Sequence, residues 1–158
     1  MIRPYAPTDL QSIIAIANAA WHDIYEMFHS CYGDALFAAI VPDAATAKGV
    51  QVQHGCETHP ECVFVCEEEG VCVGFVTFRL DEKRSIGEIG NNGVDPAWRS
   101  RGIGQQMYAA TLDHFRAAGM RFAKVHTGQD EAHAPARRAY ERAGFDIQQK
   151  DVNYYMEL

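Results

Sequence analysis

The stretch VDPAWRSRGIGQQM, residues 94–107, places Gly102 and Gly104 directly behind two arginines. An apolar run ends at Asp95, and an amphipathic pattern over residues 103–118 predicts a helix. The first backbone N–H groups of such a helix have no internal partner, and its dipole is positive at that end. Two residues without Cβ atoms would let a bulky anion reach those groups. The stretch therefore predicts either a phosphate cradle or only a flexible helix entry.

Two common phosphate motifs do not fit this stretch. Met107 occupies the position of the third glycine in G-x-G-x-x-G, which excludes a Rossmann fingerprint. No Gly-Lys-Ser/Thr follows, so a Walker loop is excluded as well. The glycine pair must therefore be interpreted from its neighbours in the chain.

The surrounding pattern alternates between strands and helices. Gly33 marks a stop within an aromatic stretch, and Glu68-Glu69-Gly70 marks the turn of an antiparallel hairpin. We expect a single domain over residues 1–158 that contains a mixed α/β sheet. The expected elements are a strand at 2–5, a helix from 10 to 21, a helix, turn and short helix over 21–40, a helix at 44–54, strands within 62–80 and 86–94, a helix at 103–118, a strand at 121–128, a helix at 133–143 and two final strands at 145–149 and 152–158.

Composition limits the function classes. The chain has 158 residues, 47% of them hydrophobic and 22% charged, which is typical of a soluble globular protein. A formal charge of −7 argues against a nucleic-acid partner, because proteins that bind nucleic acids ordinarily present a basic surface. No apolar run approaches the length of a membrane span, and the N-terminus shows no signal-peptide core. We expect a cytoplasmic protein with no membrane or nucleic-acid partner, and leave its oligomeric state open, a homodimer included.

The five cysteines predict neither disulfides nor a metal site. The odd number in a chain of this kind argues against a disulfide framework. The segment HGCETHPECVFVC, residues 54–66, gathers histidines and cysteines but has no paired C-x-x-C. Cys62 and Cys66 also fall in a run that reads as a strand. We expect buried or half-buried thiols and no metal.

Four segments together resemble the GNAT superfamily of acetyl-coenzyme A-dependent N-acetyltransferases. The glycine pair forms Arg-x-x-Gly-x-Gly from Arg99, and MIRPYAPTDL and VCVGFVTF are similar to the family's first and third strands. ARRAYERAGF, residues 136–145, is similar to a second signature with a tyrosine four residues before Gly-Phe. The resemblance covers nearly the whole chain. It implies a mostly antiparallel sheet of six to seven strands, splayed at strands four and five, flanked by four to five helices.

The resemblance also implies a reaction and a cofactor site. The reaction would move the acetyl group of acetyl-coenzyme A, as cosubstrate, to a primary amine of a small molecule. Pantetheine would pair with Gly93 and Val94, and the Val94 amide would stabilise the oxyanion. The pyrophosphate would lie against the residues of the glycine loop, which are Arg99, Ser100, Arg101, Gly102, Ile103, Gly104 and Gln105.

The resemblance suggests Tyr140 as the acid that protonates the thiolate, although its position also suits simple packing. Glu88, on the expected fourth strand, is a candidate base or an exposed strand residue. Asp23, Glu131 and His133 compete for the role of base, and none is required if water takes the proton. His133 also occupies a position where many relatives have a cofactor-binding asparagine, so it is a further candidate cofactor contact.

The acceptor would lie near the first helices and the fourth strand. Trp21 and Tyr25 form an aromatic wall that suits a cationic amine, or they belong to the core. Asn91 and Asn92 either line the acceptor site or face solvent. A protein or peptide acceptor, and a sensor that binds acyl-coenzyme A without turnover, remain alternatives to a small-molecule acceptor.

Overall fold

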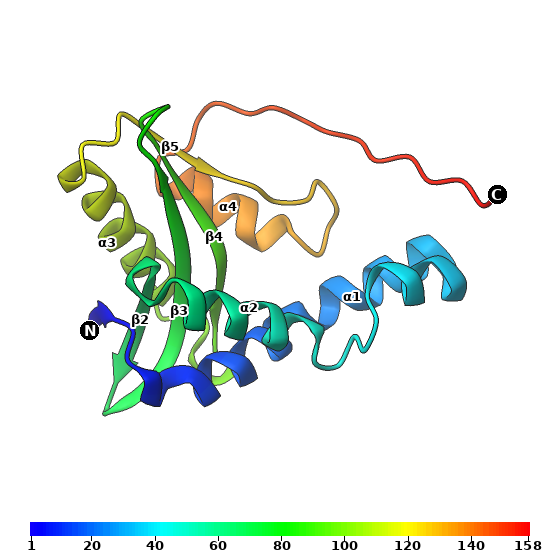
Figure 1. Cartoon of the computed structure of the whole chain (residues 1–158), viewed down its shortest axis with the longest axis horizontal. Helices are drawn as coiled ribbons and strands as arrows, with labels where there is room; N and C mark the ends of the chain where they lie inside the picture. The colour runs from blue at the N-terminus through cyan, green and yellow to red at the C-terminus, as the bar shows by residue number, and fades with distance from the viewer.

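The computed structural model describes residues 1–158 and contains a five-stranded sheet in the order β1-β2-β3-β4-β5 (Figure 1). Strands β1 to β4 pair antiparallel, whereas β5 is parallel to β4. A parallel neighbour requires a crossover connection, and α3 provides it. The strands are β1 (Ile2–Pro4), β2 (Val63–Glu68), β3 (Val71–Asp81), β4 (Ile86–Val94) and β5 (Phe122–Val125), and the helices are α1 (Leu10–Ile40), α2 (Ala47–Thr58), α3 (Ile103–Ala117) and α4 (Ala134–Arg142).

Helices cover both faces of the sheet. Helices α1 and α2 lie over one face, and α3 and α4 lie over the other (Figure 1). Phe75 of β3 is fully buried with α1 and α2, whereas Phe78 of the same strand packs with Phe115 of α3. Two hydrophobic cores therefore share one sheet.

The local turn signals are confirmed. Glu69 and Gly70 both have positive φ, at 53° and 80°, as a tight β2–β3 hairpin requires. Gly119 after α3 and Gly144 after α4 also have positive φ, which is typical of helix ends. Helix α1 is assigned across the predicted stop, but Gly33 breaks it with φ 72° and ψ 170°. The predicted turn is therefore a kink within a longer helical segment.

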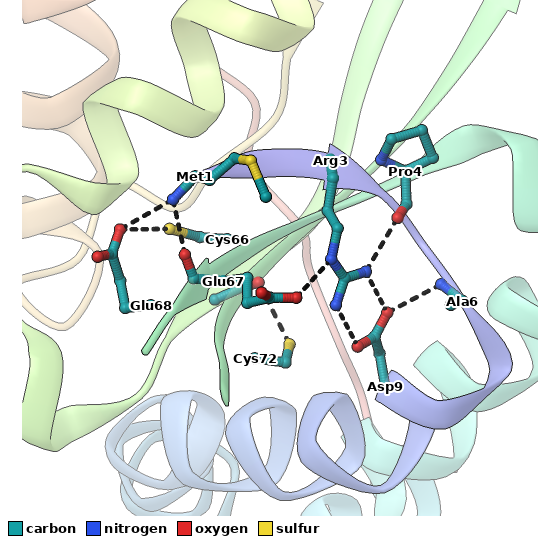
Figure 2. A network of polar contacts seen from close by, with 10 residues as sticks. Met1, Arg3, Pro4, Ala6, Asp9, Cys66, Glu67, Glu68 and Cys72 are labelled. Atoms are coloured by element: carbon teal, nitrogen blue, oxygen red, sulfur yellow. Dashed lines mark hydrogen bonds and ion pairs between the residues drawn. The ribbon is translucent and has the colours of Figure 1, made fainter. Parts of the chain in front are cut away.

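The start of the chain is fixed by a buried ion pair (Figure 2). Both guanidinium NH groups of Arg3 donate to the carboxylate of Asp9 at 2.8 Å, and its Nε donates to Glu67 at 2.7 Å. Asp9 is 5% exposed and also accepts from the backbone N–H of Ala6. Arg3 lowers the pKa of Asp9 despite its burial. Asp9 thus joins β1 to the start of α1.

The two predicted C-terminal strands are wrong. No regular secondary structure follows Arg142, and the sheet has five strands where the resemblance implied six to seven. The last residues run away from the sheet (Figure 1), and Ile147 and Tyr154 are 93% and 92% exposed. The alternating apolar residues there would form a strand only if they paired with an edge of the sheet. In the structure this segment pairs with no strand, and Tyr155 makes a ring contact with Tyr32 of α1.

Four of the five cysteines are buried or half-buried, as expected, whereas Cys31 is exposed. All five thiols are free, and burial raises the pKa of Cys56 and Cys72 to about 11, which disfavours the reactive thiolate. No three His, Cys, Asp or Glu side chains are arranged to hold a metal ion. None of the helices combines the length and the apolar character that crossing a bilayer requires.

Candidate active site

A bulge in β4 determines which side chains face which layer. Residue pairing with β3 slips between Val76 and Phe78, so that Thr77 opposes both Gly90 and Asn91. The hydroxyl of Thr77 donates to the carbonyl oxygen of Asn91 at 3.1 Å. Because of this extra residue, Asn91 faces α2 and Asn92 faces α3. The two neighbours that the sequence treated alike therefore belong to different faces.

Strands β4 and β5 separate halfway along β4. Parallel pairing runs as far as Ile89 and Val125, after which β4 pairs only with β3. The backbone N–H of Asp95 donates to the carbonyl oxygen of Val73 on β3 at 2.9 Å. Since backbone groups alternate along a strand, the N–H of Val94 points the other way, to the open edge. This is the splay that the resemblance implied between strands four and five.

The N-terminus of α3 lies just beyond that open edge in the chain and is uncapped. Gly102, with φ 76°, precedes the helix, and no side chain caps it. The first backbone bond at this end runs from Gln106 N to Gly102 O at 3.1 Å. The N–H groups of Ile103, Gly104 and Gln105 thus have no partner within the chain. Three free donors at the positive end of a fifteen-residue helix are an arrangement that favours an anion.

The glycine loop leaves space above these donors. A Cβ atom at Gly102 would meet nothing within 4 Å, and at Gly104 only Tyr108 at 4.0 Å. Ser100 adopts φ 64°, which is uncommon for a residue with a side chain and often marks a functional loop. The guanidinium of Arg101 lies 4.5 Å from the Trp98 ring, and the loop remains exposed. Arg99 is exposed beside it.

Tyr140 of α4 reaches the sheet through Asn92. The amide nitrogen of Asn92 donates to the Tyr140 hydroxyl at 3.0 Å, and its oxygen accepts from the Tyr108 hydroxyl at 2.8 Å. Tyr140 is 7% exposed, and burial raises its pKa although the bonds to Asn92 and Tyr108 oppose this. Because Asn92 fills an acceptor position of the Tyr140 oxygen, the hydroxyl proton remains free to be donated. The predicted acid is therefore protonated and oriented.

Glu88 is held in ion pairs away from Tyr140. Its carboxylate pairs with Arg79 on β3 and with Lys124 on β5, at 3.3 Å from the Lys124 ammonium. It faces the opposite side of the sheet from Ile89 and Asn92. Although burial acts to raise it, these cations lower the pKa of Glu88. The carboxylate is charged at neutral pH but is a weak base.

The acceptor-side residues come together only in part. Lys48 of α2 lies with its ammonium 4.4 Å from the Trp21 ring centre and 3.4 Å from the side-chain oxygen of Asn91. Trp21 and Asn91 therefore share one site. Tyr25 instead packs against Phe28, with ring centres 6.4 Å apart, and burial raises its pKa.

His133 precedes α4 and is engaged by a neighbour. Its Nδ1 lies 2.8 Å from the Asp130 carboxylate, and the His133 backbone N–H donates to the same group at 3.0 Å. Its ring lies 6.4 Å from Phe28. Gln105 likewise uses its side chain to bind the Ala139 carbonyl oxygen at 2.8 Å, which leaves its backbone N–H for a ligand. The side chains of both residues therefore already have partners.

The family model described as acetyltransferase (GNAT) family matches residues 21–145. This range contains both strands of the splay, the glycine loop and α4. The chain belongs to the GNAT acetyltransferase family. The sequence resemblance is thus confirmed.

Relatives and solved structures agree with this assignment. A mycothiol acetyltransferase of Nocardiopsis dassonvillei is 34% identical over 112 residues, which is 70% of this chain and 29% of that protein. One of Streptosporangium roseum is 42% identical over 69 residues, 44% of this chain and 20% of that protein. The chain thus spans less than a third of the length of these relatives. PaiA N-acetyltransferase of Thermoplasma acidophilum, solved in complex with coenzyme A, has the same fold, with a TM-score of 0.71 at 13% identity over 96% of this chain and 92% of that one.

Two residues of the site were not predicted from the sequence. Tyr108 follows Gly104 by four residues, and this spacing, which places both on one helix face, is the signal that could have identified it. Lys48 has no sequence signal, because a lysine at the start of a polar helix is ordinarily a solvated residue.

Proposed function

We propose that this chain transfers the acetyl group of acetyl-coenzyme A to a primary amine of a small-molecule acceptor. The observation that carries the proposal is the uncapped start of α3, with its free N–H groups and open glycines, next to the open edge of β4. A diphosphate fits the first feature because its charge and size match the donors and the missing Cβ atoms. An amide-bearing chain fits the second, because an unpaired strand edge offers backbone partners.

The residues that would hold acetyl-coenzyme A follow from this fit. The free N–H groups of Ile103, Gly104 and Gln105 would bind phosphate oxygens, with Arg99 and Arg101 adding positive charge. The backbone of Gly93 and Val94 would bind the pantetheine arm. When bound, acetyl-coenzyme A supplies an activated acetyl thioester and a thiolate leaving group.

Val94 and Tyr140 would act on the two ends of the broken thioester bond. The Val94 N–H at the open edge is a fixed donor for the negative charge that develops on the carbonyl oxygen. One such donor is typically worth about 3 kcal/mol of transition-state stabilisation. The Tyr140 hydroxyl, oriented by Asn92, would donate its proton to the departing sulfur. Thiols leave readily because their pKa is near 8.5, so this acid should matter by about 10²-fold.

The amine must lose a proton, and the structure favours no strong base. Glu88 stays a candidate, but its ion pairs with Arg79 and Lys124 reduce its basicity. Glu88 faces the α1 and α2 side of the sheet, opposite to Tyr140 and on the same side as Asn91. Proton removal by water, from an amine that binds uncharged, needs no further side chain. Replacing Glu88 with Gln separates the two routes, because only a catalytic Glu88 changes the acidic limb of the rate profile.

A small-molecule acceptor is supported by the names of the sequence relatives. The protein from Nocardiopsis dassonvillei, which is 34% identical over 70% of this chain, is named a mycothiol acetyltransferase. The bound acceptor would lie along the α1 and α2 face, near Trp21, Asn91 and Lys48.

A thermal-shift titration with acetyl-coenzyme A tests the cofactor part of the proposal. Ligand at 100 times its dissociation constant should add about 2.7 kcal/mol, several degrees for a chain of this size. Absence of any shift at millimolar cofactor would contradict the proposal. Release of free thiol with a panel of amines then tests turnover. If the chain binds cofactor, acetylates no amine and tolerates loss of Tyr140, it is a sensor and not an enzyme.

A further inference from the structure

Lys48 is a buried cation on the acceptor side of the sheet. It belongs to the first turn of α2 and is 9% exposed. Its ammonium donates to the side-chain oxygen of Gln51 at 2.6 Å and to that of Asn91 at 3.4 Å. The third neighbour is the face of the Trp21 ring at 4.4 Å. These contacts come from α2, β4 and α1.

All of these neighbours are neutral. Lys48 takes part in none of the ion pairs of the structure. Burial alone lowers its pKa to about 8, with no carboxylate close enough to oppose the shift. The positive end of the α2 dipole further destabilises a cation at this position. A charge taken out of water without a counter-charge is costly, and proteins ordinarily avoid it.

The ammonium contacts the part of β4 that leads to Val94. Asn91, which it contacts, is in the half of β4 that has left β5. Val94 follows three residues later, which is about 10 Å along an extended strand. Asn91 and Gln51 also line a cleft of about 150 Å³ between α2 and the sheet. Such a cleft has room for several water molecules, and hence for a carboxylate or phosphate group.

We propose that Lys48 recognises an anionic group, a carboxylate or a phosphate, carried by the amine acceptor. This inference rests on the proposed function and narrows its substrate class. The anion of the acceptor supplies the negative charge that the neutral neighbours of Lys48 lack. The acceptor is therefore held by an ion pair with Lys48 that forms only on binding. Trp21 and Asn91 keep the ammonium in place. Acceptors whose anion lies within about 10 Å of the amine would fit the spacing along β4.

Lys48→Met tests the inference without harming the fold, since it replaces an unpaired buried charge with an apolar chain of similar length. Lys48→Arg keeps the charge, and Lys83→Met removes a charge from the exposed β3–β4 turn. The acceptor probes are matched pairs: β-alanine with its amide, 4-aminobutyrate with its amide, and phosphoethanolamine with ethanolamine. The first two pairs report on a carboxylate, and the third reports on a phosphate.

Wild type should prefer at least one anionic member over its neutral partner by about 10- to 100-fold in kcat/KM, mainly through KM. Lys48→Met should abolish that preference and raise the melting temperature. Lys83→Met should change neither, and Lys48→Arg should retain part of the preference. Acetylation of the amines with no preference for a charged member would overturn the inference and leave the proposed function standing.

A binding measurement keeps the inference testable if no amine is acetylated. The ε-carbon resonance of Lys48, assigned by its loss in Lys48→Met, reports the lysine pKa during a pH titration. Inorganic phosphate or 4-aminobutyrate should raise that pKa by about one unit or more, as a bound opposite charge does. The amide of 4-aminobutyrate should not raise it. An unchanged lysine pKa with both anionic probes would overturn the inference, whether or not acetyl-coenzyme A binds.

Discussion

Tyr140 and Tyr108 bind opposite ends of the Asn92 amide, and this arrangement provides a matched pair of variants. Tyr140→Phe removes a hydroxyl that accepts from the amide nitrogen at 3.0 Å. Tyr108→Phe removes a hydroxyl that donates to the amide oxygen at 2.8 Å. Both tyrosines are buried, at 7% and 4% exposed. The two substitutions are therefore the same chemical change at two sides of one group.

The expected loss of stability is larger for Tyr108→Phe. This variant leaves the Asn92 side-chain oxygen without a partner, which costs about 1–3 kcal/mol, whereas after Tyr140→Phe the Asn92 amide nitrogen still donates to the Gly90 carbonyl oxygen at 3.1 Å. For a chain of this length the melting temperature falls by about 2–4 °C for each kcal/mol. Thermal unfolding monitored by circular dichroism measures this. A larger loss of activity in Tyr140→Phe, the less destabilised variant, is therefore not a matter of folding.

The expected loss of activity differs between the variants. If Tyr140 protonates the thiolate, Tyr140→Phe lowers kcat by about 10²-fold with little change in the KM for acetyl-coenzyme A. Tyr108→Phe should lower kcat by less than about tenfold, since it only loosens the amide that orients the acid. Thiol release at saturating cofactor measures both. Equal losses in the two variants, or no loss in Tyr140→Phe, would refute the assignment of Tyr140 as the acid.

Further substitutions test the cradle and the fold. Gly104→Val places a branched side chain among the free N–H groups, so coenzyme A affinity should fall by at least about 10²-fold in a titration while the fold persists. Asp9→Asn should lower the unfolding free energy by about 3 kcal/mol at pH 7. Because Arg3 lowers the pKa of Asp9, that contribution is complete above the unfolded pKa near 3.8 and is lost as the pH falls through the lower folded pKa. Chemical denaturation of wild type and Asp9→Asn should therefore show the difference in unfolding free energy shrinking between pH 7 and pH 3. A difference that stays constant over this range would contradict the prediction. Gly87→Ala should destabilise by about 1–3 kcal/mol, since its Cβ would overlap the aromatic ring of α3 beneath it, whereas Gly55→Ala, with open space in α2, should stabilise by about 0.5–1 kcal/mol.

The sequence predicted those parts of the fold and site that depend on local signals. The glycine pair predicted the helix start and the open space beside its free N–H groups, because missing Cβ atoms and free N–H groups are properties of the segment itself. Glu68-Glu69-Gly70 predicted the hairpin, which is likewise a local signal. The position of Tyr140 followed from a resemblance and needed no knowledge of its neighbours.

The remaining features depend on partners that the sequence does not reveal. Strand alternation places Asn91 and Asn92 on opposite faces, but only the bulge opposite Thr77 decides which of them faces α2 and which faces α3. Lys48 becomes buried only when α2 packs against Trp21 and β4. The C-terminal alternation indicated strands, but a strand forms only where an edge accepts it.

The β4 bulge also has a consequence for how such a strand can change. If β4 kept its length but alternated strictly in place of the bulge, the side chains beyond Gly90 would turn over, and Asn92 would face Lys48 instead of the tyrosine pair. Loss of Gly90 itself would instead restore a regular ladder with Asn91 and Asn92 on their present faces. The faces of these two residues thus depend on the bulge only as long as the strand keeps its extra residue.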